Sequence, residues 1–296
     1  MKQIFMNITN CPLCGSDNFE SKSVIKDFAL SQEDFTVVEC AACRLLFTNP
    51  RPDNEKIGDY YKSSSYISHT NQSKGLFGFV YQVLRNRALA LKRGWILRHA
   101  EPGKLLDYGS GTGEFLYNMQ AHGWYVKGVE IAEGPRIQSQ KKYGLDVLDP
   151  EEFQNEQASF YDLITMWHVL EHIDNLAESA ERIISKLKPG GILVLALPNP
   201  ESWDAKYYKD YWAAWDVPIH FYHFKKENIN ALASKIGLEL VETINMPFDS
   251  FYVSLLSEQY KTGSKSWIKA FMIGLFSNLK AGKNNASSLT YILRKL

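Results

Sequence analysis

All four cysteines of this 296-residue chain lie within its first 43 residues. They form two C-x-x-C pairs, Cys11 with Cys14 and Cys40 with Cys43, separated by 25 residues. Two such pairs supply four thiolates at the spacing of a closed, tetrahedral structural zinc site. The segment between them reads as short strands, so we expect residues 1–48 to form a small zinc ribbon that gains stability from the metal.

Two alternatives to zinc remain open for these cysteines. A pair of disulfides is disfavoured in a reducing cytoplasm. A thioredoxin-type redox motif needs a single C-x-x-C at a strand-to-helix junction. The presence of two C-x-x-C pairs does not fit that motif.

Residues 49–99 are expected to connect the ribbon to a larger domain. Their polar stretch contains Tyr60, Tyr61 and Tyr66, which would form either a lid over a ligand site or interdomain packing. The apolar spacing that follows predicts one or two helices. Six cations and no acid lie between Lys74 and Arg98. We interpret this run as a solvated helix face, with an anionic partner as the alternative.

From Lys104 onward the apolar runs become short and β-branched, and they alternate with segments of helical length. This alternation is typical of right-handed βαβ units that build a parallel sheet covered by helices on both faces. In such sheets ligands bind at the carboxyl ends of the strands. We therefore expect an α/β domain over residues 100–296, with its chemistry at those strand ends.

A glycine-rich turn follows the first of these strands. Asp107 ends the strand, and Gly109, Gly111 and Gly113 allow the backbone to approach a ligand closely before a helix opens. The next strand ends in Glu130, a carboxylate placed to bind two ribose hydroxyls. A nucleoside cofactor is therefore expected. The G-x-G-x-G spacing and the acidic Asp107 disfavour NAD, because a carboxylate there repels a pyrophosphate and suits an ammonium group.

With these features the sequence resembles the class I S-adenosylmethionine-dependent methyltransferases. The resemblance covers about residues 100–296 and is carried by LDYGSGTGEF, Glu130, DLITMWHVLEHI, LKPGGILVLALPNP and WDVPIHFYHF. It looks most like a subgroup in which a zinc ribbon precedes the catalytic domain, similar to ubiquinone-type O-methyltransferases and deoxysugar methyltransferases.

The resemblance implies a Rossmann-like, doubly wound sheet of seven strands. The last two strands, LELVETINM and SSLTYILRKL, would be antiparallel and separated by an insertion at about residues 248–287. It also implies that the glycine turn holds the amino-acid end of the cofactor and that Glu130 holds its ribose. The expected cofactor-binding residues are Asp107, Gly109, Ser110, Gly111, Gly113, Glu130, Ile131, Trp167 and His168.

Candidate catalytic residues follow the fourth strand. Methyl transfer requires alignment of the nucleophile and, for a hydroxyl, removal of its proton. His168, Glu171 and His172 are spaced i, i+3 and i+4, so one helical turn would place them on the same side. We favour His172 as the base, with Glu171 orienting it or binding substrate. In similar sugar and quinone enzymes the Glu-His pair at this place is functional; the alternative is that one or more of these residues caps the loop.

The five residues HVLEH also match the H-x-x-E-H motif of one group of zinc peptidases. That motif requires the middle of a helix and a distant third ligand. Here it directly follows a strand and adjoins a cofactor turn, so its context disfavours a peptidase.

A second cluster of aromatic and histidine residues lies in WAAWDVPIHFYHF, with Trp212, Trp215, Asp216, His220 and His223. We interpret this segment as one wall of a substrate pocket. The alternative is that these residues pack in the core. For the two tryptophans this interpretation fits the sequence at least as well as a pocket wall does. His220 is the better functional candidate.

The C-terminal part has an amphipathic helical pattern and a marked charge bias. Residues 261–296 carry seven cations and no acid, although the whole chain balances 33 basic against 33 acidic residues. Three interpretations compete: a helix that covers the active site, a dimer contact, and docking to an anionic membrane surface. We favour a lid or packing role and keep peripheral membrane contact as the minority view.

No apolar leader region and no run of about 18 apolar residues is visible, so we expect a cytoplasmic protein. We predict an enzyme that uses S-adenosylmethionine to methylate a small molecule, at a hydroxyl of a quinone-like, phenolic or sugar substrate. One rival is a tRNA- or rRNA-modifying methyltransferase, disfavoured because the ribbon is not basic. The other is a non-catalytic module, disfavoured by the intact Asp107, Gly109, Gly111 and Glu130. No DNA partner is expected, and the choice between monomer and homodimer stays open.

Overall fold

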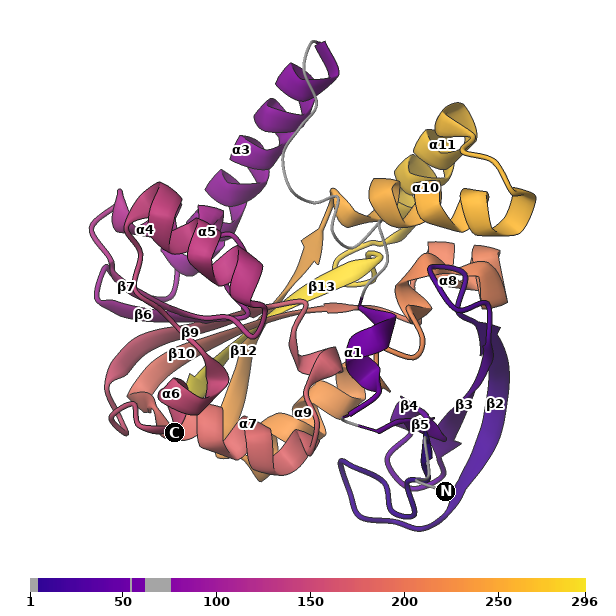
Figure 1. Cartoon of the computed structure of the whole chain (residues 1–296), viewed down its shortest axis with the longest axis horizontal. Helices are drawn as coiled ribbons and strands as arrows, with labels where there is room; N and C mark the ends of the chain where they lie inside the picture. Colours follow the sequence, from indigo (N-terminus) through magenta and orange to yellow (C-terminus); the bar gives the residue numbers. More distant parts are fainter. Residues whose placement is uncertain (1–4, 54, 62–75) are drawn as a thin grey trace.

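The computed structural model describes residues 5–53, 55–61 and 76–296, so Tyr66 lies outside the described residues. A seven-stranded sheet forms the centre of the molecule (Figure 1). In sheet order its strands are β12 (Leu238–Met246), β13 (Ser288–Lys295), β10 (Leu187–Pro198), β9 (Tyr161–Trp167), β6 (Lys104–Tyr108), β7 (Tyr125–Val129) and β8 (Val147–Leu148). Only β13 runs against its neighbours, pairing antiparallel with both β10 and β12. The predicted seven-stranded sheet with its antiparallel last pair is confirmed.

Helices cover both faces of this sheet because successive residues of a buried strand point to opposite sides. Leu105 packs with side chains of α3 (Leu76–Ile96) and α4 (Glu114–Gln120). The next residue, Leu106, packs in a second cluster with α7 (Leu176–Ser185) and α9 (Lys226–Lys235). The remaining covering helices are α5 (Glu133–Tyr143) and α6 (Pro150–Gln154). Helix α3 confirms the prediction of a helix over the apolar part of the connector.

The N-terminal region forms a separate, smaller sheet from β2 (Phe19–Lys26), β3 (Asp34–Cys40) and β4 (Leu46–Thr48). Its fourth strand is β11 (Tyr222–His223), which comes from far along the chain and pairs antiparallel with β4. A two-stranded pair, β1 (Phe5–Met6) with β5 (Arg51–Pro52), and the short helix α1 (Ile57–Tyr60) complete this part. The boundaries at residues 48 and 99 stay a prediction.

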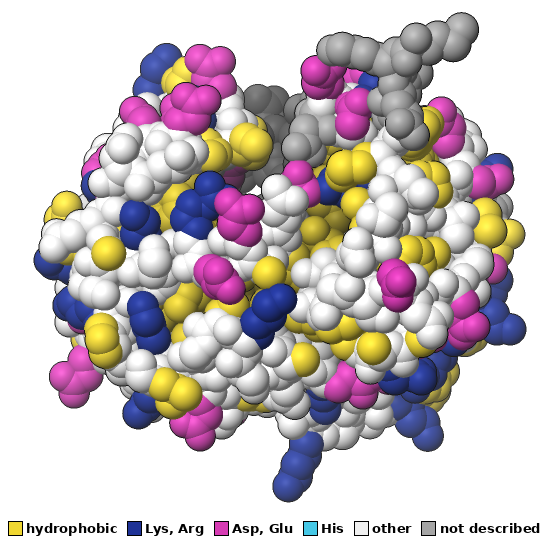
Figure 2. Space-filling view, turned by 90° about the horizontal axis from the view of Figure 1, so that it is seen from below, with side chains coloured by type: hydrophobic (Ala, Val, Ile, Leu, Met, Phe, Trp, Pro, Cys, Tyr) yellow, Lys and Arg dark blue, Asp and Glu magenta, His cyan; other side chains and the backbone are white. Residues whose placement is uncertain are grey.

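The segment between β12 and β13 is a helical hairpin of α10 (Asp249–Thr262) and α11 (Trp267–Lys280). It packs against α8 (Trp203–Tyr208) through a third apolar cluster. In Figure 1 this hairpin and α3 rise on the same side of the molecule. On the opposite side, seen in Figure 2, acidic and basic side chains are intermixed. Within the described part of the chain, no helix combines the length and apolar character needed to cross a bilayer.

Candidate functional site

The glycine turn lies between β6 and α4, and all three of its glycines have positive φ angles. A Cβ on Gly109 would lie 2.3 Å from Cγ2 of Val169, and one on Gly113 would lie 2.3 Å from Oγ of Ser139. Close approach therefore excludes a side chain at both positions. Gly111 faces open space, so only its φ of +54° favours glycine there. The turn is thus packed at its two ends and open at its middle.

Glu130 directly follows β7 and faces this open middle. One carboxylate oxygen accepts a hydrogen bond from the backbone N–H of Gly111 at 2.8 Å, and the other accepts from Ala132 at 2.9 Å. Because each carboxylate oxygen has two acceptor positions, both oxygens keep capacity for a further donor. The next residue, Ile131, is 81% exposed. The expected juxtaposition of the turn and Glu130 is present.

Asp107 lies buried beneath the turn and accepts a hydrogen bond from Oγ1 of Thr165 at 2.6 Å. Burial raises the pKa of Asp107 to about 7, although Thr165 and the charge of Lys92 oppose the shift. Nζ of Lys92 lies 4.0 Å from the centre of the Trp167 ring. Burial also lowers the pKa of Lys92. Lys92 is thus turned toward the site, a placement that the sequence interpretation of a solvated helix face missed.

His168 follows β9 with a φ of +57°, a conformation that side chains other than glycine rarely adopt. Its Nε2 lies 3.0 Å from Oδ2 of Asp249, and its Nδ1 lies 3.4 Å from Oε1 of Glu171. Burial opposes a charged ring, but the two carboxylates outweigh it and raise the pKa of His168 to about 9. His168 is therefore an imidazolium at neutral pH.

His172 is held by the backbone and stays neutral. Its Nδ1 donates to the carbonyl of Ile219 at 3.0 Å and lies 3.2 Å from the hydroxyl of Tyr61. Burial lowers the pKa of His172, and Glu171 only partly opposes this. A neutral ring that donates through Nδ1 carries its lone pair on Nε2, where it can accept a proton.

His220 packs edge-on against His172, with the ring centres 4.6 Å apart. Its Nδ1 donates to the carbonyl of Ala214 at 3.0 Å. Burial, followed by the charges of the neighbouring His172 and His223, lowers the pKa of His220 well below its ordinary value. The structure thus brings together two neutral histidines from segments that lie far apart in the sequence.

Glu171 lies between these groups and is fully buried. Within the described residues, neither of its carboxylate oxygens has a hydrogen-bond partner. The ligand atoms of Glu171, His172 and His220 all lie within 4.8 Å of one another. Glu171 thus has the charged His168 ring as an ion-pair partner but accepts no hydrogen bond, so it can stabilise a further positive charge formed beside it. His168, Glu171 and His172 lie together, as their spacing predicts. The backbone from Leu170 is, however, a 3₁₀ turn and not an α-helix.

The other residues of the aromatic cluster mostly pack in the core. Trp212 is buried and its Nε1 donates to Asp204 at 2.8 Å. The ring of Trp215 packs on those of Trp212 and His223. Burial lowers the pKa of His223 to about 3 and raises that of Asp216 to about 7. Only His220 of this cluster adjoins His172.

Two of the three connector tyrosines are described. The hydroxyl of Tyr60 donates to Glu33 at 2.6 Å and so ties the connector to the N-terminal sheet. Tyr61 contacts His172 as noted above, which brings the connector to the site.

Asp249 was missed by the sequence interpretation, although a signal exists. It follows the end of β12 by three residues, at the same edge of the sheet as the other strand ends. Lys92 was also missed, and here the sequence offers no signal. The helical pattern around Lys92 does not distinguish this lysine from its solvated neighbours.

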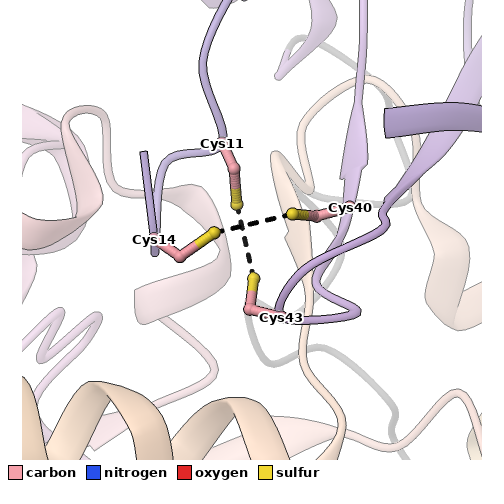
Figure 3. A group of neighbouring side chains, drawn as sticks. All are labelled: Cys11, Cys14, Cys40 and Cys43. Carbon is pink, nitrogen blue, oxygen red and sulfur yellow. Dashed lines mark hydrogen bonds between the residues drawn. The ribbon is translucent and has the colours of Figure 1, made fainter. Parts of the chain in front are cut away.

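The four cysteines converge as Figure 3 shows. Sγ of Cys11 lies 3.5 Å from that of Cys43, and Sγ of Cys14 lies 3.6 Å from that of Cys40. A disulfide would require about 2.05 Å. Four thiolates at about 2.3 Å from a tetrahedral zinc ion would be separated by about 3.8 Å. The donor set and its spacing fit such an ion.

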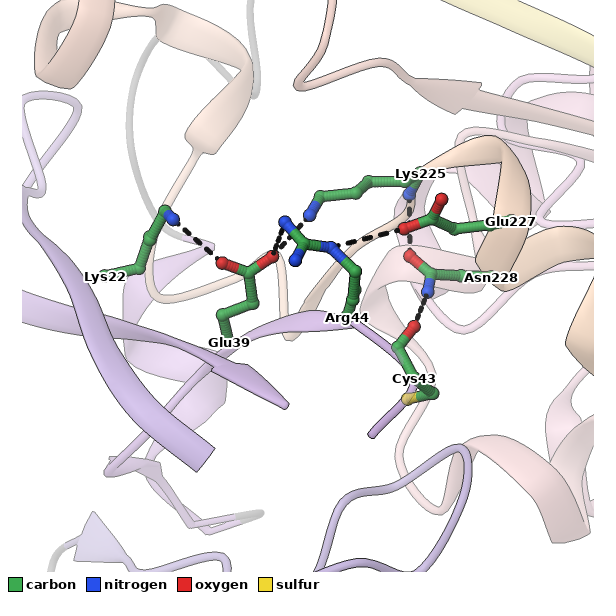
Figure 4. Close-up of polar contacts among 7 residues, drawn as sticks. All are labelled: Lys22, Glu39, Cys43, Arg44, Lys225, Glu227 and Asn228. Atoms are coloured by element: carbon green, nitrogen blue, oxygen red, sulfur yellow. Dashed lines mark hydrogen bonds and ion pairs between the residues drawn. The ribbon is translucent and has the colours of Figure 1, made fainter. Parts of the chain in front are cut away.

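An ion-pair network centred on the buried Glu39 and Lys225 fastens this region to α9 (Figure 4). Glu39 pairs with Lys225 at 2.6 Å and with Lys22 and Arg44 at 2.9 Å. The side-chain amide of Asn228 also donates to the carbonyl of Cys43 at 2.7 Å. The cysteine cluster is therefore held in place by the start of α9.

Residues 80–243, more than half of the chain, match a family model described as a methyltransferase domain. The chain belongs to this methyltransferase family.

Two curated relatives are the ubiquinone biosynthesis O-methyltransferases of Acinetobacter baylyi and Aromatoleum aromaticum. The first is 29% identical over 126 residues, which cover 38% of this chain and 53% of the relative. The second is 30% identical over 118 residues, which cover 37% and 50%. The chain thus spans about half the length of the curated relatives it matches.

Two solved structures share the fold. Magnesium protoporphyrin IX methyltransferase from Synechocystis, with bound S-adenosylhomocysteine, superposes with a TM-score of 0.55 at 14% identity, covering 82% of this chain and all of that one. Phosphoethanolamine N-methyltransferase 2 from Haemonchus contortus, in complex with S-adenosylmethionine, gives 0.53 at 17% identity, covering 94% and 68%.

Proposed function

We propose that this chain transfers a methyl group from S-adenosylmethionine to a hydroxyl of a small molecule of the quinone-like, phenolic or sugar class. The observation that carries the proposal is the backbone-held, neutral His172 beside the buried Glu171. Both lie in the loop whose Val169 touches Gly109 of the turn. The names of the curated relatives support a hydroxyl acceptor.

The residues around the glycine turn fit this cofactor. Glu130 has capacity for two ribose hydroxyls, and the open middle of the turn leaves room for the amino-acid end. Oγ of Ser110 and Nε1 of Trp167 are buried without a hydrogen-bond partner within the described residues, as expected where a ligand supplies one. We assign Asp107, Gly109, Ser110, Gly111, Gly113, Glu130, Ile131, Trp167 and His168 to cofactor binding.

When bound, S-adenosylmethionine supplies a sulfonium methyl group to a nucleophile. Nε2 of His172 takes the proton of the acceptor hydroxyl, while its Nδ1–H stays on Ile219 and fixes the ring. Glu171 stabilises the imidazolium that forms. His220, whose ring packs edge-on against that of His172, lines the same acceptor site. His168 is already charged, so it positions Glu171 rather than acting as the base.

We further propose that Cys11, Cys14, Cys40 and Cys43 hold a structural Zn²⁺ ion. Residues 1–48 then make up the ribbon, residues 49–99 the connector, and residues 100–296 the catalytic domain with its insertion. The spacing of the four sulfur atoms supports this assignment.

Calorimetry with S-adenosylhomocysteine tests the cofactor site. The wild-type chain should bind, and Glu130→Ala should bind at least about tenfold more weakly because two charge-assisted hydrogen bonds are lost. Equal affinity in both proteins would remove the basis for the cofactor assignment.

A methylation assay with a panel of catechols, quinols and nucleotide sugars tests the substrate class. His172→Gln should lower kcat at least about 100-fold on any accepted substrate. The exposed His122 supplies the matched control, and His122→Gln should keep full activity. Methylation of bulk tRNA, with no turnover of the panel, would contradict the small-molecule assignment.

A further inference from the structure

Helix α11 presents large apolar side chains to solvent as well as to the protein. Ala270, Ile273, Gly274 and Ser277 face the protein. The solvent side carries seven exposed large apolar residues: Trp267, Ile268, Phe271, Met272, Leu275, Phe276 and Leu279. The most exposed are Ile268 at 82%, Leu279 at 70% and Trp267 at 61%. A contiguous exposed apolar surface of this kind marks an interaction site, so the solvent side is expected to have a partner.

The charged side chains of α11 and of the segments that flank it are all positive. Lys265, Lys280 and Lys283 are exposed, and within the described residues no carboxylate lies within ion-pair distance of them. Lys269 is paired with Glu258 at 3.0 Å. No acid occurs from residue 261 to the end of the chain.

Helix α3 extends on the same side of the molecule as α11 (Figure 1). It exposes Val83 and Leu84 together with Arg87, in a segment that also lacks acidic residues. The opposite side mixes acidic and basic side chains (Figure 2). Apolar exposure and unbalanced positive charge therefore coincide on one side of the protein.

We propose that the apolar side of α11 docks onto the surface of an anionic lipid bilayer. The exposed aromatic and aliphatic side chains enter the boundary between headgroups and acyl chains, and the lysines contact lipid phosphates. A second copy of this chain fits less well, because it would bring two acid-free, cationic segments together. Anionic lipid neutralises the same charge.

This docking connects the membrane to the site. Asp249, the first residue of α10, holds His168 of the proposed active site at 3.0 Å. Helices α10 and α11 pack along each other in one hairpin. The helix that contacts lipid is thus part of the element that completes the site, an arrangement suited to an acceptor with an apolar tail.

Co-sedimentation with lipid vesicles tests the proposal on the full chain. Phosphatidylcholine vesicles with about 30% phosphatidylglycerol should bind the protein at least about tenfold more tightly than pure phosphatidylcholine. The variant Trp267→Ser/Ile268→Ser/Leu279→Ser should lose this binding. Each lysine removed should weaken vesicle binding by about tenfold or less. Replacing Lys265, Lys280 and Lys283 together by Gln should therefore weaken vesicle binding on the order of 100-fold.

Matched controls separate docking from misfolding. Val24→Ser/Tyr125→Ser removes side chains that are 58% and 57% exposed elsewhere, and it should bind vesicles like the wild type. All variants should retain the circular dichroism and S-adenosylhomocysteine affinity of the wild type.

Three results would overturn the proposal: equal binding to neutral and anionic vesicles, no binding to either, or a dimer that the α11 triple substitution dissolves. If Glu130→Ala bound S-adenosylhomocysteine as tightly as the wild type, the proposed function would be refuted. The docking result would then still stand.

Discussion

Replacing Glu39 with glutamine should destabilise the protein far more than a typical surface substitution. The side chain of Glu39 is 6% exposed and that of its partner Lys225 is 9% exposed. Without the carboxylate, the Lys225 ammonium stays buried with its charge uncompensated. Breaking a buried ion pair from one side costs about 3–5 kcal/mol. We expect a loss of about 3 kcal/mol in the free energy of unfolding, because the introduced amide oxygen can still accept one hydrogen bond from Lys225.

Urea unfolding at neutral pH, followed by tryptophan fluorescence, measures this loss. Lys22→Gln is the matched control, since Lys22 contacts the same carboxylate but is 52% exposed, and it should cost at most about 1 kcal/mol. The double variant Glu39→Gln/Lys225→Met should recover part of the loss, because it removes the unpaired charge. The reasoning is refuted if Glu39→Gln and Lys22→Gln cost the same.

The same carboxylate gives an acid-side pH dependence. Burial alone would raise the pKa of Glu39, but the hydrogen bonds from Lys225 and Lys22 outweigh it and hold the pKa below its ordinary value. A lowered folded-state pKa means that the stabilisation is present above the unfolded-state pKa of about 4.3 and is lost as pH falls through the folded-state value. Wild-type stability should therefore drop more steeply than that of Glu39→Gln below about pH 4.

Three further predictions concern the glycine turn, His168 and the cysteines. Gly109→Ala should cost about 1–3 kcal/mol more than Gly111→Ala in urea unfolding, because only the former Cβ meets Val169; equal costs would contradict the close packing. The pKa of His168 is raised to about 9, so its stabilising effect is full below about pH 6.5 and is lost as pH rises through about 9. Melting temperatures across that range should fall more in the wild type than in His168→Gln, and parallel curves would argue against the Asp249 pair. A strong chelator should lower the melting temperature, added zinc should restore it, and Cys43→Ser should no longer respond to either; an unchanged melting temperature would exclude a structural metal.

The features that the sequence predicted are those encoded by local spacing. The glycine turn and Glu130 each follow the end of a strand, and neighbouring parallel strands place such ends at one edge of a sheet. The cysteine pairs likewise indicate their geometry through their spacing. The i, i+3, i+4 spacing of His168, Glu171 and His172 likewise predicted that these three side chains lie close together.

Features that depend on tertiary packing were not predictable in this way. Lys92 has no pattern that separates it from the solvated cations of α3, and only the helix's rotation against the sheet turns it toward Trp167. The aromatic cluster was ambiguous because alternating aromatics suit both a pocket wall and a core, and Trp212 proved to be core. Strand β11 has two residues, too few for any periodicity to show.

The pairing of β11 with β4 makes the N-terminal region a structural support for the candidate site. The hydroxyl of Thr48 donates to the carbonyl of His220 at 2.8 Å, and its N–H donates to the carbonyl of Phe221 at 3.0 Å. Phe221 in turn donates to the carbonyl of Glu171 at 2.8 Å. A line of main-chain hydrogen bonds thus runs from β4 through Phe221 to the backbone carbonyl of Glu171. The N-terminal sheet therefore helps to fix the backbone of the segment that carries Glu171 and His172, far along the chain from it.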